Sequence, residues 1–301
     1  MERYDSIILG AGPAGLAAAL YSARAGKKIL VLDKGTPGGQ IYLSSLVENY
    51  PGVKSTDGQK LVETMVEQAK SFGAEIKPFA EVTEADLKNK TLKTKEGTEY
   101  NAESIIIATG NRWRKLNVPG EEEFVGRGVS YCATCDGPFF KGQEVAVIGG
   151  GNTAVEEAMH LTNFASKVFV VHRRDQLRAE KYLQEKAFKN EKMEFIWDSE
   201  VKSINGEGKV ESITLKNKKT GEETSLGVGG AFIFIGMLPN SELFKGQLET
   251  DERGYIITNE KMQTSIPGVY AAGDVRSSPV KQITTATADG TVASIVSCGG
   301  H

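Results

Sequence analysis

The chain opens with short apolar segments separated by a glycine-rich turn and a run of small apolar residues. Residues 4–9 end in a β-branched run that is typical of a buried strand. The turn at 10–15 contains three glycines, and the pattern of residues 16–24 predicts a helix. A second strand is predicted at 28–33. Strand, glycine turn, helix and strand in this order are typical of a unit that binds a dinucleotide.

The same pattern returns in the second half of the chain. Residues 144–148 predict a strand, 149–154 a glycine turn, 155–162 a helix and 168–171 another strand. Each position of the turn is displaced by 139 residues, as from Gly10 to Gly149. In such turns the first glycine makes the bend, the second admits a pyrophosphate, and the helix N-terminus supplies amide donors. Two bound dinucleotides are therefore expected.

The two copies differ at the position that contacts the ribose. Asp33 ends the first copy's second strand, where a carboxylate can hydrogen-bond a ribose 2′-hydroxyl. The equivalent residue, His172, opens a basic cluster with Arg173 and Arg174, which Arg178 could join if a helix starts nearby. Because arginine can bind a 2′-phosphate, the second site should prefer NADP, with a solvated basic turn as the alternative. The first site suits NAD or FAD, and a reductant and its acceptor in one chain favour FAD.

The remaining pattern predicts the architecture. Further elements are expected in both halves, followed by a last strand and a helix from about Gln282: 58–72 (helix), 75–110, 200–204, 210–217, 224–228, 231–236 and 268–274 (strands). The fold class is therefore α/β, with two three-layer Rossmann-like domains, each with a β-meander, the second inserted in the first. The FAD-binding domain is expected at 1–113 and 244–301. The NADPH-binding domain, which carries the cysteine pair, is expected at 117–241.

Composition excludes several classes of function. Lysine and arginine number 36 against 39 acidic residues, so the net charge of −3 offers no basic field for nucleic acid. No stretch approaches 18 apolar residues, and the first residues lack the features of a secretory signal. A cytoplasmic, soluble protein without a membrane partner is expected. Glycine, at 34 of 301 residues, is in excess, as close backbone contacts require.

The three cysteines narrow the chemistry further. Cys132 and Cys135 form a Cys-x-x-Cys pair, which is typical of half a zinc site or of a redox-active dithiol. Zinc would need two further ligands, and the three histidines with Cys298 supply no second close pair. No metal is therefore expected, and the redox interpretation is favoured. Cys298, near the end of the chain, is assigned no role.

With these motifs in place, the sequence resembles the low-molecular-weight thioredoxin reductases over nearly its whole length. The resemblance rests on the segments GAGPAGLAAA, GGQ, ENYPG, IIIATG, CATCDG, GGGNTAVEEA, HRRDQLRAEK, IGMLPN and TSIPGVYAAGDV. CATCDG is the most specific, because it lies in the inserted domain. The resemblance implies a homodimer that passes electrons from NADPH to FAD, to the Cys132–Cys135 disulfide and to thioredoxin. It also implies that Cys135 faces the flavin, Cys132 attacks thioredoxin and Asp136 is the acid/base, although Asp136 could instead simply form a turn.

The resemblance also implies two sets of cofactor-binding residues. Those for FAD are Gly10, Gly12, Pro13, Ala14, Gly15, Asp33, Lys34, Gly39, Gln40, Asn49, Thr109, Gly110, Gly273, Asp274, Lys281, Gln282 and Ile283. Those for NADPH are Gly149, Gly151, Asn152, Thr153, Ala154, His172, Arg173, Arg174 and Arg178. Lys281 replaces the family's usual arginine, Met237 stands where some members have histidine, and the chain ends early at His301.

Other functions remain open at this stage. A flavin disulfide reductase of the same fold could serve another protein disulfide or take electrons from ferredoxin, although the basic cluster argues against ferredoxin. A redox-inert flavin-binding or interaction protein would not need the cysteine pair. The resemblance further implies that the inserted domain rotates about its two crossings. The sequence does not identify the particular thioredoxin.

Overall fold

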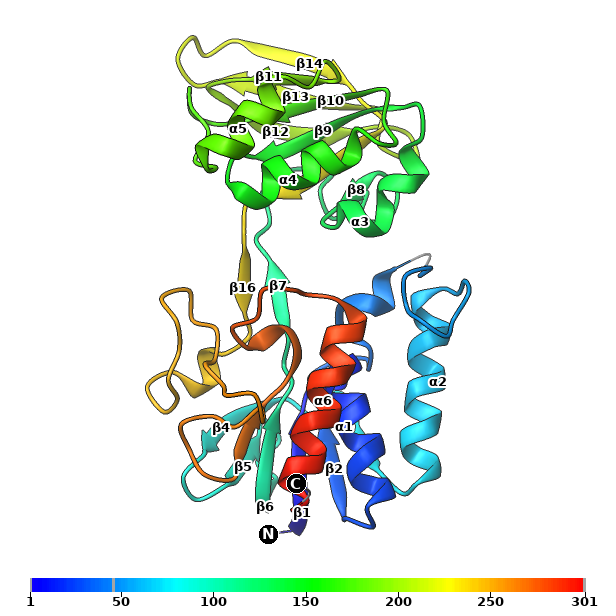
Figure 1. Cartoon of the computed structure of the whole chain (residues 1–301), viewed down its shortest axis with the longest axis vertical. Coiled ribbons are helices and arrows are strands. Elements are labelled where there is room, and N and C mark those ends of the chain that lie inside the picture. Colours follow the sequence, from blue (N-terminus) through cyan, green and yellow to red (C-terminus); the bar gives the residue numbers. More distant parts are fainter. Residues whose placement is uncertain (1, 45–46, 300–301) are drawn as a thin grey trace. The chain divides into compact units, whose positions relative to one another are not determined.

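The computed structural model describes residues 2–44 and 47–299, and it divides into two compact units. The first comprises Met1–Arg112 and Leu238–His301, and the second Trp113–Met237. The chain crosses between them twice, in β7 (Asn111–Trp113) and β16 (Met237–Pro239), which pair as a two-stranded sheet (Figure 1). The sequence placed the return to the first domain at residue 244, whereas the division falls six residues earlier, at Leu238.

The first unit is built on a sheet in the order β3-β2-β1-β6-β5-β4, with β17 beside β6. Its parallel strands are β1 (Glu2–Leu9), β2 (Ile29–Leu32), β3 (Glu75–Lys77), β6 (Glu99–Ile107) and β17 (Val269–Ala271). The antiparallel strands are β4 (Val82–Asp86) and β5 (Thr91–Thr94), which extend the sheet as the expected meander. Because β17 pairs with β6, the last segment of the chain joins the first unit's sheet.

Alternating residues of β1 supply two cores, one on each face of this sheet. Ile8 packs in the cluster that includes residues of the helices, whereas Ile7 and Leu9 pack in the cluster on the other side. The helices are α1 (Pro13–Arg24), α2 (Gly58–Ser71) and α6 (Ile283–Ser297), with short 3₁₀ turns at Gly39–Leu43, Glu242–Phe244 and Gly273–Val275. Helices α1 and α6 lie side by side (Figure 1), and Ser22 and Ser294 hydrogen-bond at 2.7 Å.

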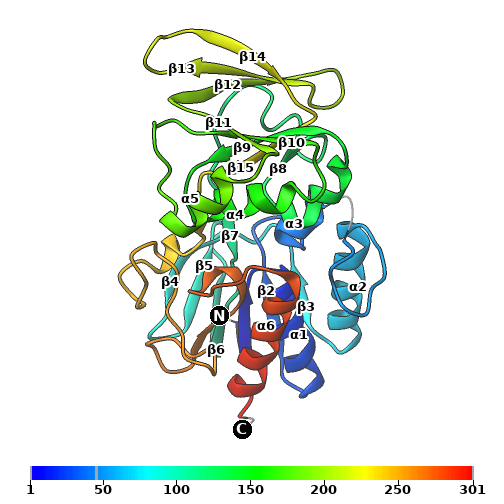
Figure 2. The ribbon, with the colours of Figure 1, turned by 45° about the horizontal axis from the view of Figure 1, so that its top comes forward.

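The second unit repeats the parallel sheet in the order β11-β10-β9-β15-β8. Its strands are β8 (Val129–Ser130), β9 (Glu144–Gly149), β10 (Lys167–Val171), β11 (Met193–Ile196) and β15 (Gly230–Phe234). Its helices are α3 (Ala133–Asp136), α4 (Asn152–Leu161) and α5 (Lys181–Phe188), with a 3₁₀ turn at Gly137–Phe140. The meander, β12 (Ser199–Asn205), β13 (Ser212–Asn217) and β14 (Glu223–Gly227), forms a separate sheet (Figure 2).

Helix α4 begins three residues before the predicted start, at Asn152, because the glycine turn itself leads directly into the helix. Within the described residues, no helix is long and apolar enough to cross a membrane.

Candidate functional site

In the first unit, the predicted FAD-binding residues follow the carboxyl ends of four neighbouring strands, β1, β2, β6 and β17. Gly10 leaves β1 with φ +104°, and a Cβ there would collide with the backbone of Ala108. Helix α1 then begins with Gly12 as its N-cap and Pro13 in its first turn. In the described part of the chain, a Cβ on Gly12 would meet nothing within 4 Å. The first amides of α1 are therefore open to an anion such as a pyrophosphate.

Asp33 is fixed beside this turn at the end of β2. Its carboxylate accepts hydrogen bonds from the N–H groups of Ala11 at 2.6 Å and Gly35 at 2.8 Å. These two donors hold the carboxylate in one orientation, next to the place where a bound adenosine ribose would lie. Lys34, also predicted for this site, is exposed to solvent.

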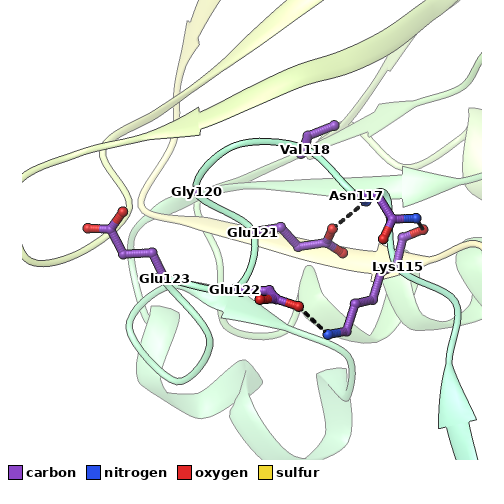
Figure 3. Close-up of a pocket in the computed structure, with 7 residues that line it drawn as sticks. All are labelled: Lys115, Asn117, Val118, Gly120, Glu121, Glu122 and Glu123. Atoms are coloured by element: carbon purple, nitrogen blue, oxygen red, sulfur yellow. Dashed lines mark hydrogen bonds and ion pairs between the residues drawn. The ribbon is translucent and has the colours of Figure 1, made fainter.

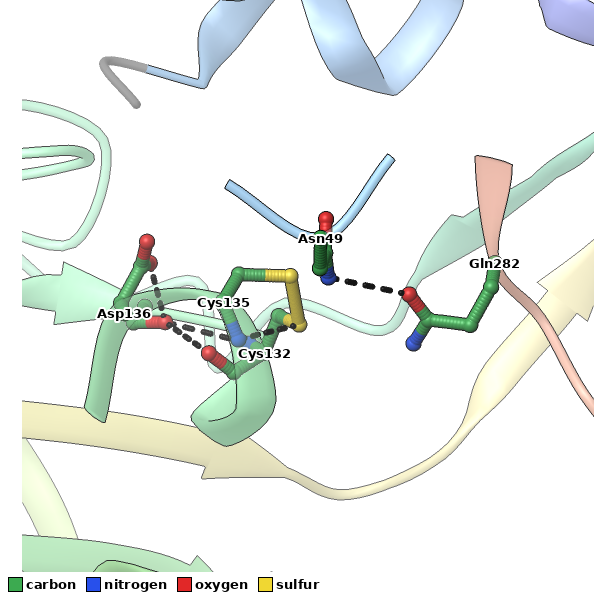
Figure 4. The surroundings of a disulfide bond; sticks show 6 residues. Asn49, Cys132, Cys135, Asp136 and Gln282 are labelled. Atoms are coloured by element: carbon green, nitrogen blue, oxygen red, sulfur yellow. Dashed lines mark hydrogen bonds between the residues drawn. A yellow bond between two sulfur atoms is a disulfide. The ribbon is translucent and has the colours of Figure 1, made fainter. Parts of the chain in front are cut away.

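Side-chain amides form two separate contacts among the residues near the predicted flavin end. The Nε2 atom of Gln40 lies 2.6 Å from both the carbonyl oxygen and the side-chain oxygen of Asn111. Asn49 donates to Gln282 over 3.4 Å (Figure 4), and Gln282 is the N-cap of α6. Gly39 lies in the same short turn as Gln40. The structure thus brings Asn49 to the start of α6, where Ile283 is the first helical residue.

Asp274 and Lys281 form a second polar group in this unit. Burial raises the pKa of Asp274 to about 6, a rise that Asp289 reinforces and Lys281 opposes. Burial also lowers the pKa of Lys281, whose ammonium donates to the carbonyl oxygens of Asp274 at 3.0 Å and Arg276 at 2.7 Å. Lys281 therefore acts through single, separate hydrogen bonds, which a lysine makes as well as an arginine.

This segment is held by an ion pair that the sequence did not predict. Arg276 lies 3.1 Å from Asp289, and both side chains are largely buried. Asp289 also accepts the N–H of Gly273 at 3.1 Å, which ties helix α6 to the end of β17. Asp289 is the only charged residue in the sequence of α6, and this isolation within an apolar helix was a signal that could have identified it.

In the second unit, β8, β9 and β10 deliver three predicted features to one edge of the sheet: the cysteine pair, the glycine turn and the basic cluster. Helix α4 begins with Gly151 as its N-cap, and in the described residues a Cβ there would meet nothing within 4 Å. Asn152, the first helical residue, exchanges two hydrogen bonds with Glu180, at 2.9 Å and 3.1 Å. Thr153 and Ala154 complete the first turn, which is again open to a pyrophosphate.

The basic cluster divides into one buried and three exposed residues. His172 is 4% exposed, and its ring lies against Gly150 so closely that a Cβ on that glycine would collide with it. Burial lowers the pKa of His172, so the imidazole is neutral at pH 7. Its Nε2 atom has no hydrogen-bond partner among the described residues. His172 therefore supports the glycine turn by packing and adds no positive charge.

The three arginines of this cluster, Arg173, Arg174 and Arg178, are exposed. The N–H of Arg178 donates to the carbonyl oxygen of Gly150 at 2.7 Å, which places this residue next to the glycine turn. Helix α5 begins only at Lys181, so the expectation that Arg178 lies one helical turn after Arg174 is wrong. The loop from β10 supplies the proximity instead.

The cysteine pair is a disulfide at the start of a four-residue helical turn, α3, which begins three residues after the end of β8. Cys132 is the N-cap, and its Sγ accepts the N–H of Cys135 at 3.2 Å. Burial raises the pKa of Asp136, and a hydrogen bond of 2.6 Å from the hydroxyl of Ser130 opposes the rise. A carboxyl group with a raised pKa, next to a disulfide, is suited to hold and release a proton during thiol exchange.

A surface hollow of about 310 Å³ lies on the first crossing's loop, lined by Lys115, Asn117, Val118, Gly120, Glu121, Glu122 and Glu123 (Figure 3). Glu121 is buried, and it accepts the N–H groups of Leu116 and Asn117 and the hydroxyl of Tyr131. Lys115 pairs with Glu122 at 2.5 Å. Because Lys115, Glu121 and Glu122 already have partners in the chain, we interpret the hollow as a structural feature of the loop.

Comparisons with known proteins agree with this geometry. Residues 4–290 match the family described as pyridine nucleotide-disulphide oxidoreductase. A thioredoxin reductase of Peptoclostridium acidaminophilum is 51% identical over 298 residues, which cover 96% of this chain and 94% of that protein. One of Bacillus subtilis (strain 168) is 51% identical over 292 residues, covering 96% and 92%. The crystal structure of thioredoxin reductase from Streptococcus pyogenes MGAS5005 is similar with a TM-score of 0.93 and 47% identity, covering 98% of this chain and 97% of that one.

Proposed function

The chain belongs to the thioredoxin reductases of the pyridine nucleotide-disulphide oxidoreductase family, and we propose that it reduces thioredoxin through its Cys132–Cys135 disulfide. FAD and NADPH are its cofactors, as the sequence predicted. The observation that carries the proposal is the sheet edge of the second unit. There, a disulfide beside a half-buried carboxyl group shares one edge with an open glycine turn and exposed arginines.

The chain's residues fit both cofactors, which, when bound, supply a hydride donor and a carrier that passes two electrons on to a disulfide. The amides that follow Gly12 and Gly151 would hold the two pyrophosphates. Asp33 would hold the ribose of FAD, and Arg173 and Arg174, which are exposed, would hold the 2′-phosphate of NADPH. His172 keeps the second turn in shape without contributing charge.

In the reduced protein, the thiolate of Cys132 attacks the disulfide of thioredoxin and forms a mixed disulfide. Asp136 gives its proton to the first thioredoxin thiolate that leaves, then takes the proton of the Cys135 thiol. Cys135 attacks Cys132, and the second thioredoxin thiolate leaves and is protonated by Asp136. Asp136 regains one proton from water. The protein dithiol is oxidised to a disulfide, and the thioredoxin disulfide is reduced to a dithiol.

Both the disulfide and the NADPH site belong to the second unit, whereas the FAD site belongs to the first. The inserted domain must therefore present two different sites to one flavin in turn. We propose that the paired crossings β7 and β16 are the hinges of this exchange. The chain passes from one unit to the other in these two strands, so a rotation of the inserted domain would take place about them.

The protein acts as a homodimer in this proposal, and α6 supplies part of the contact. Thr284, Ala288 and Ile295 lie on its exposed stripe, which carries no charged side chain in the described residues. A helix face of this kind is unusual on a surface that meets only water. A reducing compartment such as the cytoplasm suits the function, because the dithiol must be regenerated in each turnover.

The test is the anaerobic reduction of the FAD-loaded protein by NADPH and, separately, by NADH, followed by flavin absorbance near ~450 nm. We expect fast bleaching with NADPH and much slower bleaching with NADH. Arg174→Ala should raise the NADPH concentration for half-maximal rate by about tenfold or more, since it removes a charge-assisted contact. Lys209→Ala, an exposed basic residue elsewhere in this unit, is the control.

Oxidised thioredoxin added after NADPH should restore the flavin colour in the wild type but not in Cys135→Ser. Failure of both nicotinamides to bleach the flavin would contradict the proposal and would point to another electron donor such as ferredoxin. Bleaching without turnover of thioredoxin would point to another protein disulfide as the substrate.

A further inference from the structure

We propose that Ser130 is a positioning residue for proton transfer at the redox disulfide, because its hydroxyl fixes the carboxyl group of Asp136 against the cysteine turn. This inference rests on the proposed role of Asp136 as the proton donor. Ser130 is the last residue of β8, two residues before Cys132, and it is only 3% exposed. It lies outside the cysteine pair and was not among the residues predicted from the sequence.

The Ser130 hydroxyl joins three parts of the turn. It accepts the N–H of Cys132 at 3.1 Å, and it lies 2.6 Å from Oδ2 of Asp136 and 3.2 Å from the carbonyl oxygen of Cys132. A hydroxyl has one hydrogen to donate. The shorter contact, to an ionisable acceptor, is the stronger one, so the hydrogen points to Asp136. The same oxygen thus holds the backbone of the attacking cysteine and the side chain of the acid.

Asp136 depends on this contact. Among the described residues, the Ser130 hydroxyl is the one side-chain donor to its carboxyl group, while burial of the group raises its pKa. The hydrogen bond stabilises the carboxylate and so moderates that rise. Without it, the acid would hold its proton more tightly and its side chain would lose its fixed orientation. Both changes slow a proton transfer whose geometry must be set in advance.

Other ionisable groups come close from helix α4, which packs against α3. Glu157 accepts the N–H of Ala133, and its second oxygen is buried without a partner in the described part of the chain. His160 lies near Glu157 on the same helix and lowers its pKa, against the larger effect of burial. Neither contributes to the shift of Asp136, so Ser130 is the residue whose removal should act on the acid directly.

The experiment measures kcat/KM for oxidised thioredoxin with the FAD-loaded protein and NADPH, between about pH 5.5 and 9. The variants are Ser130→Ala, Asp136→Asn and the double variant. Ser104→Ala is the matched control, because Ser104 is a buried serine of the other unit whose hydroxyl donates to a backbone carbonyl at 3.2 Å. Ser130→Thr retains the hydroxyl. Flavin reduction by NADPH, measured in parallel, reports whether each variant is folded and holds its cofactors.

We expect Ser130→Ala to lower kcat/KM for thioredoxin by about tenfold and to move the pH-dependent limb to higher pH, since the acid loses a hydrogen bond to its charged form. Flavin reduction by NADPH should be unchanged. Ser130→Thr should restore much of the rate, and the double variant should be no slower than Asp136→Asn. The proposal would be overturned if Ser130→Ala left the pH dependence of kcat/KM unchanged. It would also be overturned if the loss of kcat/KM in the double variant were the product of the losses in the two single variants.

Asp136→Asn separates this inference from the role of the acid itself. If that variant keeps the wild-type rate and pH profile, Asp136 is not the proton donor, and the inference about Ser130 falls with it. Asp136→Asn could instead lower kcat/KM about a hundredfold or more while Ser130→Ala has the same kcat/KM as Ser104→Ala. Asp136 would then be the proton donor, and Ser130 would not be its positioning residue.

Discussion

Asp274 is a carboxyl group that the fold keeps largely away from water, and its pH dependence can be worked out from its pKa. The folded value of about 6 lies above the ordinary aspartate value of about 4. Ionisation therefore opposes folding. This effect is absent below about pH 4 and grows until the pH passes about 6, where it approaches ~3 kcal/mol for a shift of this size.

Removing this charge should stabilise the protein only at higher pH. We expect Asp274→Asn to unfold at a higher urea concentration than the wild type at pH 7.5, and at nearly the same concentration at pH 4. The measurement is urea unfolding of the FAD-free protein, because bound FAD would change the surroundings of the carboxyl group. An equal effect of the substitution at both pH values would contradict the assignment of the raised pKa.

For single residues, the sequence predicted which residues belong to the sites better than it predicted their surroundings in the fold. The offset of 139 residues identified His172 as the counterpart of Asp33, but only the fold shows that its imidazole is buried against Gly150. Ser130 could not be predicted, because its role arises from a turn that returns Asp136 to the end of β8. A serine in a two-residue strand carries no pattern of its own.

The contact between α1 and α6 depends on a missing side chain. A Cβ at Gly290 would collide with the carbonyl of Ala14, in the first turn of α1. Alanine favours a helix over glycine by about 1 kcal/mol, whereas overpacking against backbone costs about 1–3 kcal/mol. The net effect of the substitution should therefore be destabilising. We expect Gly290→Ala to lower the free energy of unfolding and to weaken FAD binding, because the displaced turn carries the open amides.

Urea unfolding and FAD titration would measure both effects. Gly227→Ala is the matched control, since among the described residues a Cβ at Gly227 would meet nothing within 4 Å. If Gly290→Ala were as stable as that control, α1 and α6 could move apart without a loss of stability, which would contradict the prediction.

Helices with a clear apolar period and strands with an apolar run were predicted, whereas the short elements that hold the cysteine pair were not. The apolar spacing of α2 predicted its bounds to within one residue, at Gly58–Ser71. Strand β8 and helix α3 span two and four residues, too few to show any period, although they hold the redox disulfide. Helix α5 lies in a stretch rich in charged residues, where its buried face is reduced to Ala187. The local sequence therefore indicated the nucleotide sites more clearly than the short elements β8 and α3 that hold the cysteine pair.

At the scale of the whole molecule, the internal repeat predicted two similar units, and the division of the chain depends on long-range pairing. Strand β17 joins β6 across more than 150 residues, and β7 pairs with β16 at the crossings. No local pattern encodes either pairing. The repeat explains why each unit places its glycine turn after a parallel strand, since both inherit the same strand, turn and helix.

Assembly of two copies can be tested on the exposed face of α6. Ile295 is 42% exposed, and its charge-free stripe should be covered by the second copy in the proposed homodimer. A lysine placed in such a contact would be buried without a partner, which opposes association by several kcal/mol. We expect Ile295→Lys to shift the protein from dimer to monomer in analytical ultracentrifugation of the FAD-loaded form. Ile257→Lys is the control, because Ile257 is 43% exposed and lies outside this helix. A dimer that survives Ile295→Lys at micromolar concentration would place the contact on another surface, and a wild-type monomer would remove the homodimer from the proposed function.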